Sequence, residues 1–254
     1  MDPAAAVDPA AAVDPAGAAD AGDAVRIDAL EFTWRAGLAP CLAIPALRIG
    51  AGERVFIQGM SGSGKSTLLN LVAGVAVPTR GSLRLFGHEL GALGGAARDR
   101  LRGDHIGYIF QQFNLIPYLS AIDNVLLPVH FSARRRARAR QQGASPRDAA
   151  IALLARLDID AASGARRAAQ LSIGQQQRVA AARALIGAPE IVIADEPTSA
   201  LDSERQQAFL DLLMACCAAA GSALLFVSHD QRLAAGFDRQ VRMEELNRAP
   251  RGPA

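Results

Sequence analysis

Apolar residues recur along this chain in short runs that predict strands, separated by longer stretches of helical character. Residues 25–30 alternate apolar and polar positions, as a strand buried on one face does. Residues 191–194 and 223–227 are apolar throughout, which predicts strands covered on both faces of a sheet. Further strands are expected at residues 47–49, 54–58, 81–87 and 106–110. Strands spread along the whole chain in this way favour an α/β fold with a mainly parallel sheet.

The stretch from about residue 112 to 170 interrupts this series of strands. It is polar, alanine-rich and helical in character. Ser120 and Ser145 each stand three residues before an aspartate, a spacing typical of a helix N-terminus, and Pro146 occupies the first helical position after the second serine. We therefore expect a helical subdomain of about residues 112–170, inserted into the domain that contains the sheet.

The N-terminal end of the chain has low complexity. Residues 1–24 repeat the sequence Asp-Pro-Ala-Ala-Ala-Val with a period of six. A proline in each repeat prevents a continuous helix, and alanine offers too little apolar surface for a core. No basic side chain precedes Arg26, so the segment lacks the charge pattern of a signal peptide. We expect a disordered tail at 1–24, unless translation starts further downstream, a folded domain at 25–247 and a second tail at 248–254.

Composition limits both the number of domains and the class of partner. Half of the 254 residues are hydrophobic and 20% are charged, which suits one α/β core with a subdomain. The formal net charge of +2 creates no strong field toward nucleic acid. The arginine-rich run at residues 134–140 could be a nucleic-acid patch, a contact with anionic lipid, or a solvated helix or loop. Because no aromatic residue interrupts the run, we favour the solvated helix or loop and expect no nucleic-acid partner.

The cysteines and the longest apolar stretch bear on the compartment. Three cysteines, an odd number without metal-ligand spacing, indicate a reducing, cytoplasmic setting, with Cys216 and Cys217 as core residues. The longest apolar stretch, residues 212–227, is interrupted by Gly221 and Ser222 and is shorter than the ~20 residues that a membrane-spanning helix needs. It predicts a helix end, a glycine turn and a buried strand. Any role at a membrane is therefore expected to act through a partner.

Residues 59–67 contain the strongest chemical signal. Their sequence, which fits the phosphate-binding pattern G-x-x-x-x-G-K-[ST] between an expected strand and an expected helix, is Gly59-Met60-Ser61-Gly62-Ser63-Gly64-Lys65-Ser66-Thr67. Lys65 is the only lysine among 27 basic residues. Glycines allow backbone N–H groups to surround phosphate oxygens, and an ammonium on a flexible stem follows terminal phosphates better than a guanidinium. We expect this loop to bind a nucleoside triphosphate.

Two acids follow the apolar run that ends at Ala194. Asp195 can hold Mg²⁺ through water while the Ser66 hydroxyl ligates the ion directly. Glu196 can orient or deprotonate an attacking water. An exposed strand terminus would carry the same two acids, so the pair by itself leaves both interpretations open.

A motif at residues 171–178 distinguishes among the classes of protein that share a phosphate-binding loop. Its sequence, which resembles the LSGGQ signature of ABC-type ATPases, is Leu171-Ser172-Ile173-Gly174-Gln175-Gln176-Gln177-Arg178. Ser172 and Gln175 also form a capping-box pattern at the start of a helix expected over residues 173–185. That start would present a hydroxyl, N–H groups and the positive end of the helix dipole to a γ-phosphate. Ile173 replaces the first glycine of the signature, whereas Gly174 keeps the second.

The resemblance covers residues 25–247 and implies roles for single residues. Gln111 matches the glutamine that senses Mg²⁺ and the attacking water, and His229 matches the histidine that contacts the γ-phosphate. Asp202 lies in a loop, residues 199–202, that reaches the opposite subunit, and Trp34 or alternatively Phe32 would stack on adenine. The implied nucleotide-binding residues are Trp34, Gly59, Ser61, Gly62, Ser63, Gly64, Lys65, Ser66, Thr67, Ser172, Gly174, Gln175 and Asp202; the implied catalytic residues are Glu196, His229 and Gln111; the implied metal ligands are Ser66, Gln111 and Asp195.

The resemblance also implies a fold and a biological setting. ABC-type ATPases have a P-loop core with a mainly parallel sheet, an N-terminal antiparallel β region and a helical subdomain. Within that family, residues 107–117 and 171–178 are most similar to the lipoprotein-release and macrolide-export branch (LolD and MacB type). This branch implies a homodimer that closes on ATP and Mg²⁺ at the cytoplasmic face of a membrane and drives a transmembrane permease, with or without a periplasmic adaptor.

Two other functions would use the same motifs. One is a non-transport ATPase that regulates a membrane complex, in the manner of the FtsE-like cell-division proteins. The other is a DNA-repair or translation ATPase, which the single phosphate-binding loop and the lack of heptads disfavour. The apolar segment 111–127 favours a membrane partner, because we expect part of it to be core and the rest to form a groove for a permease helix.

Overall fold

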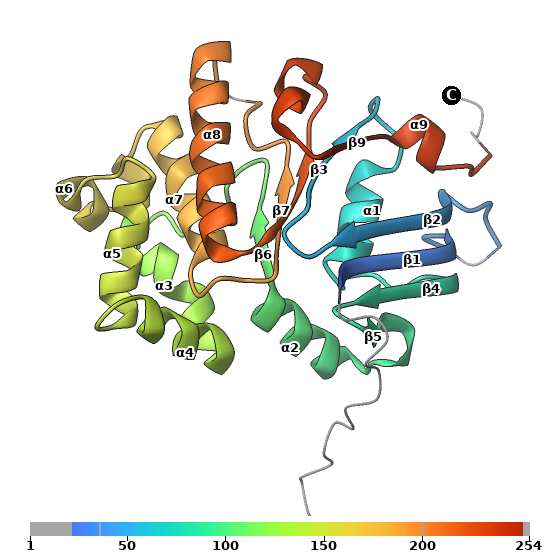
Figure 1. The fold of residues 1–254 in the computed structure, drawn as a ribbon, viewed down its shortest axis with the longest axis horizontal. Coiled ribbons are helices and arrows are strands. Elements are labelled where there is room, and N and C mark those ends of the chain that lie inside the picture. Colours follow the sequence, from blue (N-terminus) through green and yellow to red (C-terminus); the bar gives the residue numbers. More distant parts are fainter. Residues whose placement is uncertain (1–21, 36, 200, 251–254) are drawn as a thin grey trace, which may run out of the picture.

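The computed structural model describes residues 22–35, 37–199 and 201–250. Residues 1–21 of the expected N-terminal tail and residues 251–254 of the expected C-terminal tail lie outside the described residues, as does Ala200 of the loop at 199–202. The described residues form two sheets with helices packed around them (Figure 1).

A parallel sheet of five strands forms the centre of the fold. Its strand order is β6-β7-β8-β3-β9, and every pair of neighbours runs parallel. The strands are β3 (Arg54–Gln58), β6 (Ile106–Ile109), β7 (Ile191–Asp195), β8 (Ala223–Val227) and β9 (Arg239–Arg242). Strands β7, β8 and β3 occupy the middle positions, in agreement with the covered strands that the apolar runs of β7 and β8 predict.

An antiparallel sheet with the strand order β2-β1-β4-β5 packs beside the parallel one. Its strands are β1 (Asp23–Phe32), β2 (Leu42–Gly50), β4 (Arg80–Leu85) and β5 (His88–Glu89). This sheet confirms the antiparallel β region implied by the resemblance. Strands β1 and β2 precede the phosphate-binding loop in the chain, whereas β4 and β5 follow it.

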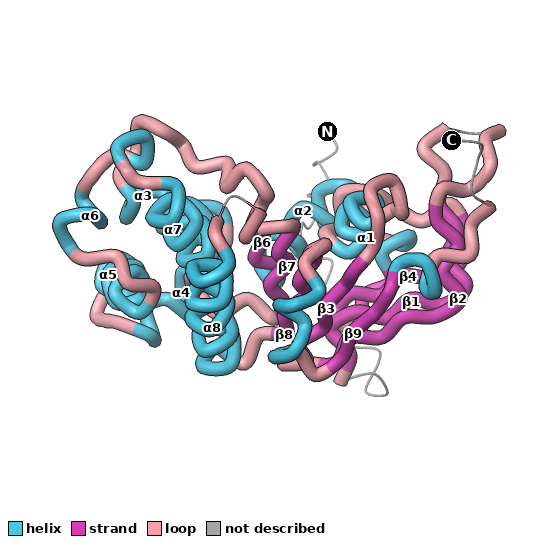
Figure 2. The backbone as a smooth tube through the Cα atoms, turned by 90° about the horizontal axis from the view of Figure 1, so that it is seen from above, coloured by secondary structure: helices cyan, strands magenta, loops and turns pink. Residues whose placement is uncertain are grey.

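Helices α3 to α8 gather on one side of the parallel sheet, and the antiparallel sheet lies on the other (Figures 1 and 2). The α-helices are α1 (Lys65–Val72), α2 (Gly95–His105), α3 (Ala121–Phe131), α4 (Ala133–Gln142), α5 (Pro146–Arg156), α6 (Ala161–Ala165), α7 (Ile173–Leu185), α8 (Ser203–Ala220) and α9 (Met243–Leu246). Short 3-10 helices are η1 (Leu90–Ala92), η2 (Ala168–Gln170) and η3 (Gln231–Gly236). In the described part of the chain, none of the helices has both the length and the apolar character needed to cross a bilayer.

Two hydrophobic cores cover the two faces of the parallel sheet, because successive residues of a strand point to opposite faces. On β3, Phe56 packs into the core formed with α3, α5, α7 and α8. Its neighbours Val55 and Ile57 pack into the core formed with α1 and the antiparallel sheet. The apolar side chains of α1, Leu68, Leu69, Leu71 and Val72, are therefore buried between the two sheets. Cys216 and Cys217 are buried in the first core, as predicted.

The helix boundaries predicted from capping residues are confirmed. Ser120 Oγ accepts a hydrogen bond from the Asp123 N–H at 3.0 Å at the start of α3. Ser145 Oγ does the same for the Asp148 N–H at 3.2 Å at the start of α5. Gly221 ends α8 with a φ of +66°, a left-handed conformation that glycine adopts readily, before β8 begins.

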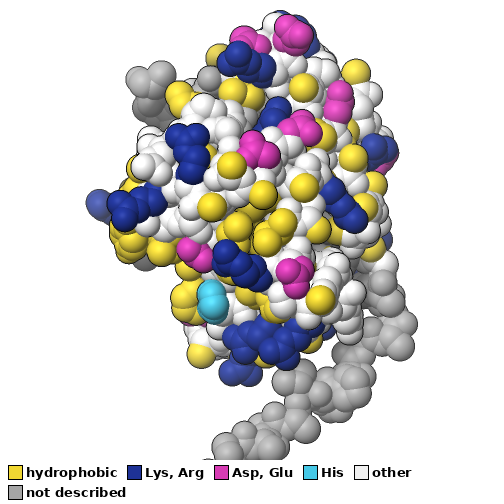
Figure 3. Space-filling view, turned by 90° about the vertical axis from the view of Figure 1, so that its left-hand side faces the viewer, with side chains coloured by type: hydrophobic (Ala, Val, Ile, Leu, Met, Phe, Trp, Pro, Cys, Tyr) yellow, Lys and Arg dark blue, Asp and Glu magenta, His cyan; other side chains and the backbone are white. Residues whose placement is uncertain are grey.

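The arginine-rich run forms α4, and the prediction of a solvated helix or loop is wrong for Arg135. This side chain is 2% exposed and donates to main-chain carbonyl oxygens, including that of Ile186 at 2.8 Å. A guanidinium can be buried there because its several N–H donors satisfy several carbonyls at once. Figure 3 shows the adjoining face of the molecule, where basic side chains lie among apolar and acidic ones, with a denser basic group at the lower edge.

Candidate active site

The phosphate-binding loop, residues 59–67, joins the end of β3 to the start of α1. Gly62 and Gly64 have φ angles of +78° and +99°, in the left-handed region that residues with a side chain rarely adopt. At Gly59 there is no room for a side chain, since an added Cβ would lie 2.7 Å from the Cβ of Met243. The glycines that the motif requires are thus required by the shape of this loop.

Lys65 is the first residue of α1, and its side chain bends back over the loop. Its Nζ donates to the main-chain carbonyl oxygens of Gly59 at 2.6 Å and Met60 at 3.0 Å. These contacts place the ammonium near the N-terminus of α1, where the helix dipole and unpaired N–H groups also favour an anion. The loop therefore presents positive charge and N–H donors on one side of an open cavity.

That cavity, of about 580 Å³, brings together side chains from four segments of the chain. Besides the phosphate-binding loop, it is lined by Gln111, Asp195, Glu196 and His229. Gln111 follows β6, the two acids lie at the end of β7, and His229 follows β8. These strands are parallel neighbours, so their carboxyl ends lie at the same edge of the sheet. The fold therefore brings the predicted catalytic and metal-binding residues next to the loop.

The two acids differ in environment although they are adjacent. Burial raises the pKa of the Asp195 carboxyl, the neighbouring Glu196 carboxylate raises it further, and Lys65 opposes both effects. Glu196 has a φ of +44° and its N–H donates to the Val227 carbonyl oxygen at 2.9 Å. Its Oε2 lies 3.1 Å from Nδ1 of His229. Asp195 thus sits where a cation would favour its charged form, whereas Glu196 points toward the histidine.

The signature, residues 171–178, lies at the start of α7 and away from this cavity. Both halves of the predicted capping box are present, with Ser172 Oγ accepting from the Gln175 N–H at 3.3 Å and Gln175 Oε1 accepting from the Ser172 N–H at 3.0 Å. A separate cavity of about 550 Å³ opens there and is also lined by Leu201 and Asp202. Among the described residues, none lines both cavities. Within the described part of one chain, the signature and the phosphate-binding loop do not meet.

The surface around the signature has space for additional atoms. A Cβ added at Gly174 would meet no atom within 4 Å, so packing within the described residues does not require glycine here. Ile173, which replaces the first glycine of the signature, is 56% exposed. Asp202 differs from both, because its Oδ1 caps α8 by accepting from the Arg205 N–H at 3.0 Å.

The two aromatic candidates for stacking on adenine are distinguished by burial. Trp34 is 60% exposed, whereas Phe32 is 6% exposed and belongs to the core beside the antiparallel sheet. The two rings make an edge-to-face contact with centroids 4.9 Å apart. Burial therefore favours Trp34 over Phe32 for stacking on a base, and the stacking role stays a prediction. Trp34 remains the candidate, although it does not line the cavity at the loop.

The C-terminal segment supports the phosphate-binding loop, which the sequence analysis does not predict. Glu244 Oε1 accepts from the Met60 N–H at 2.9 Å. Asn247 Nδ2 donates to the Ser63 carbonyl oxygen at 3.2 Å. Each pair is separated by 184 positions, and no local pattern near residue 244 marks a contact over such a distance.

The apolar segment after Gln111 is divided between core and surface. Phe113 is 7% exposed and Tyr118 is 71% exposed. Arg183 on α7 donates to the carbonyl oxygens of Phe113 at 2.5 Å and Asn114 at 2.7 Å. The segment is therefore tied to the helix that begins at the signature. The groove for a permease helix stays a prediction.

Comparison with known proteins agrees with these motifs. The family described as ABC transporter matches residues 43–199. The chain is 42% identical over 202 residues to the lipoprotein-releasing system ATP-binding protein LolD of Pseudomonas fluorescens, which covers 78% of this chain and 84% of that protein. It is 42% identical over 214 residues to the macrolide export ATP-binding/permease protein MacB of Chromobacterium violaceum, which covers 82% of this chain and 31% of that longer protein.

Solved structures with a similar fold support the same family. A dimeric structure of the ATP-binding cassette MJ0796 in a post-hydrolysis state, bound to ADP and Pi, has a TM-score of 0.71 at 33% identity and covers 90% of this chain and 100% of that chain. A second dimeric structure of MJ0796, a bacterial ABC transporter cassette, has a TM-score of 0.73 at 34% identity with the same coverage. Motifs, fold and relatives agree, and the chain belongs to the ABC transporter family as one of its ATP-binding and ATP-hydrolysing subunits.

Proposed function

We propose that this chain works as a head-to-tail homodimer in which each ATP lies between the phosphate-binding loop of one copy and the signature of the other. The separation of the two cavities within one chain carries this proposal. In such a dimer the same surface serves both partners, so two equivalent ATP sites form together. Ser172, Gly174, Gln175 and Asp202 would complete the site of the other copy.

The cavity at the loop fits Mg²⁺ as well as ATP. Ser66, Gln111 and Asp195 line it and can each present an oxygen atom, the ligand type that a hard cation prefers. The burial that raises the pKa of Asp195 also favours a compensating cation beside it. When bound, Mg²⁺ supplies positive charge to the phosphates. We assign these three residues to the Mg²⁺ site, with Ser66 as a direct ligand and Asp195 acting through water.

Glu196 is the residue that we assign to the attacking water, because its carboxylate can accept a hydrogen bond or a proton from that water. His229 orients this carboxylate, because its Nδ1 lies 3.1 Å from Glu196 Oε2 and can donate to it. Lys65 and the loop N–H groups hold the terminal phosphates, which stabilises charge that develops during phosphoryl transfer.

The partner that we propose is a transmembrane permease, with the chain bound at the cytoplasmic face of the membrane. This chain corresponds to 31% of MacB, a protein named as both ATP-binding and permease, and to 84% of LolD, named as ATP-binding only. The comparison supports a separate permease chain as the part that this subunit energises. An adaptor in the periplasm would bind the permease rather than this subunit.

Mixing two inactive variants tests the head-to-tail dimer. Lys65→Ala disables the loop half of each site, and Gly174→Asp adds a carboxylate to the signature half, where there is space for a side chain. Each variant alone should lack ATPase activity. A mixed dimer contains one site built from two intact halves, so an equimolar mixture should recover up to roughly a quarter of the wild-type rate.

The control is a mixture of either variant with the double variant Lys65→Ala/Gly174→Asp. A mixed dimer of Lys65→Ala with the double variant has no intact phosphate-binding loop, and one of Gly174→Asp with the double variant has no intact signature, so these mixtures should stay inactive. If the two single variants also fail to complement each other, while both bind wild-type chain, the composite site is wrong.

A further inference from the structure

Arginines of α4 contact the C-terminal end of α7 and the first residues of β6 and β7. The opposite ends of these three elements carry the signature, Gln111 and the two acids of the proposed ATP sites. Arg135 Nε donates to the Ile186 carbonyl oxygen at 2.8 Å, and its terminal nitrogens donate to the carbonyl oxygens of Ala184 and Ile106. Ala184 and Ile186 lie at the C-terminal end of α7, which begins at the signature. Ile106 begins β6, the strand that leads to Gln111. One side chain therefore joins the signature helix to a strand of the catalytic edge.

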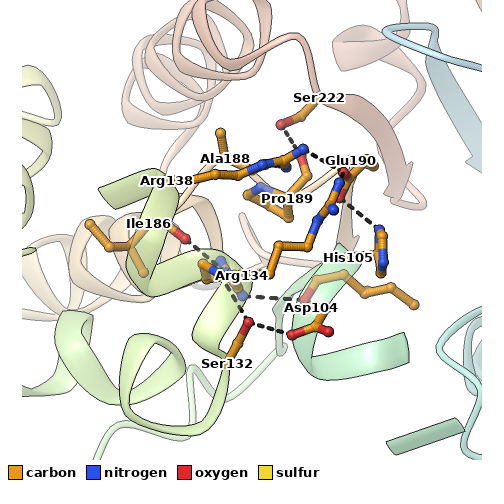
Figure 4. Close-up of polar contacts among 12 residues, drawn as sticks. Asp104, His105, Ser132, Arg134, Arg138, Ile186, Ala188, Pro189, Glu190 and Ser222 are labelled. Atoms are coloured by element: carbon orange, nitrogen blue, oxygen red, sulfur yellow. Dashed lines mark hydrogen bonds and ion pairs between the residues drawn. The ribbon is translucent and has the colours of Figure 1, made fainter. Parts of the chain in front are cut away.

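Strand β7 is held at its start by the same helix. Glu190 Oε1 accepts from Arg134 Nη2 at 2.5 Å and from Arg138 Nη2 at 2.8 Å (Figure 4). Glu190 Oε2 lies 3.0 Å from Nδ1 of His105, the last residue of α2. Strand β7 ends at Asp195, which lies about 16 Å from Glu190 along the strand. The α4 arginines thus contact all three elements that lead to the signature, to Gln111 and to the two acids.

The junction leaves little room for these elements to shift. Gly187 has a φ of +72°, and a Cβ added there would lie 2.6 Å from the Arg135 carbonyl oxygen. A Cβ added at Gly107 on β6 would overlap the Ala184 carbonyl oxygen. Backbone packs directly on backbone at both glycines. Closely packed elements of this kind transmit a displacement instead of absorbing it.

Charge also links the residues of this junction. Burial lowers the pKa of Arg135 to about 10, while the negative charges of Glu190 and Asp104 oppose that effect. Burial alone would raise the pKa of Glu190, but its contacts with His105 and the α4 arginines lower it to about 2. Both groups are therefore charged at neutral pH. Neutralising Glu190 would remove the negative charge that Arg134, Arg138 and His105 contact.

We propose that Arg135, supported by Glu190, is a positioning residue for ATP-driven dimer closure. It sets the angle between α7 and strands β6 and β7, and therefore where the signature stands relative to the catalytic edge of its own copy. Helix α7 is about 20 Å long, so a tilt of about 3° at its Arg135 end moves Ser172 by about 1 Å. A misplacement of that size can lower a rate by about 100-fold. This inference rests on the head-to-tail dimer proposed above.

The test compares Arg135→Lys and Glu190→Gln with Arg140→Lys, a control on the exposed side of the same helix. Arg135→Lys keeps the charge but cannot bond three carbonyls in the same geometry. ATP affinity is measured by titration at a protein concentration at which size-exclusion chromatography shows a monomer. ATP-driven dimerisation is followed in a Glu196→Gln background, and kcat is expressed per nucleotide-binding site.

We expect Arg135→Lys to bind ATP within about twofold of wild type but to lose at least about tenfold in kcat and in ATP-driven dimerisation. Glu190→Gln should likewise keep its ATP affinity and lose kcat and ATP-driven dimerisation, but by a smaller factor. Arg140→Lys should match wild type in all three quantities. If both variants only lower the melting temperature and keep kcat per site, the junction is merely structural and the inference is overturned. If Arg135→Lys does not fold, Glu190→Gln decides by the same criteria. A wild-type chain that binds ATP without dimerising would instead overturn the proposed function, and the inference with it.

Discussion

Nδ1 of His229 lies 3.1 Å from Oε2 of Glu196, although 33 positions separate the two residues in the chain. They meet because each follows a strand of the parallel sheet, and β7 and β8 are neighbours there. The bond from the Glu196 N–H to the Val227 carbonyl oxygen, 2.9 Å long, keeps the two strand ends in register. The carboxylate proposed to handle water is therefore oriented by the residue proposed to contact the γ-phosphate.

We expect Glu196→Gln to bind ATP but to hydrolyse it at least about 100-fold more slowly than wild type, because the amide keeps the shape of the side chain and loses its basicity. A stable dimer should then accumulate with Mg²⁺ and ATP. Size-exclusion chromatography with and without ATP measures this, with ADP as the control nucleotide. Near-normal turnover would assign the role of base to another residue.

Lys65→Ala should weaken ATP binding, and Lys65→Arg should weaken it too. A guanidinium is planar and larger, so it fits poorly where Nζ now contacts the Gly59 and Met60 carbonyl oxygens. Trp34 is the only tryptophan, so its fluorescence can follow the titration. Wild-type affinity in Lys65→Arg would contradict the argument. A Trp34 signal that stays constant while calorimetry shows binding would exclude Trp34 from stacking on adenine.

Tyr118→Asp should uncouple the permease from the ATPase. Tyr118 is 71% exposed in the apolar segment that follows Gln111, so a carboxylate there should disturb a docked permease helix without disturbing the fold. The basal ATPase rate should stay within about twofold of wild type, while stimulation by the permease is lost. The measurement compares both rates with and without permease in detergent or nanodiscs. Full stimulation of the variant, or loss of its basal activity, would contradict the proposed groove.

Glu190→Gln should change how stability depends on pH. The pKa of Glu190 is lowered from 4.5 to about 2 in the fold, so its charged form stabilises the protein at pH values above 4.5, and this stabilisation is lost as the pH falls toward 2. We expect wild type to exceed Glu190→Gln by about 2 kcal/mol in unfolding free energy at pH 7. The difference should shrink below pH 4.5.

Urea unfolding at several pH values measures this difference, and Glu245→Gln is the matched control because the Glu245 side chain is 72% exposed. Wild type and Glu190→Gln could also differ in unfolding free energy by the same amount at pH 7 and pH 3. That result would show that the ionised carboxylate is not the source of the difference.

Several elements encoded by local patterns could be predicted within a residue or two, but β2 begins at Leu42, five residues before the strand expected at residues 47–49. Helix α7 begins at Ile173, as the capping box predicts, and ends at Leu185, as expected, and β7 and β8 coincide with their apolar runs. The residues that line the cavity at the phosphate-binding loop lie in or beside short motifs, and their roles stay predictions. The choice between Trp34 and Phe32 could not be made locally, because it depends on which ring the antiparallel sheet covers.

The sequence by itself determined that this chain binds a nucleoside triphosphate and belongs among the ABC-type ATPases. The phosphate-binding loop, the two acids and the signature are each short runs of consecutive residues, so each can be recognised without the fold. The tertiary structure decided which distant residues meet. Arg135 looks like a solvated arginine in its own segment, and it is buried because the carbonyls of Ala184 and Ile186 lie against α4. Likewise Glu244 reaches the Met60 N–H across 184 positions. Such contacts depend on the packing of whole elements, which no short pattern records.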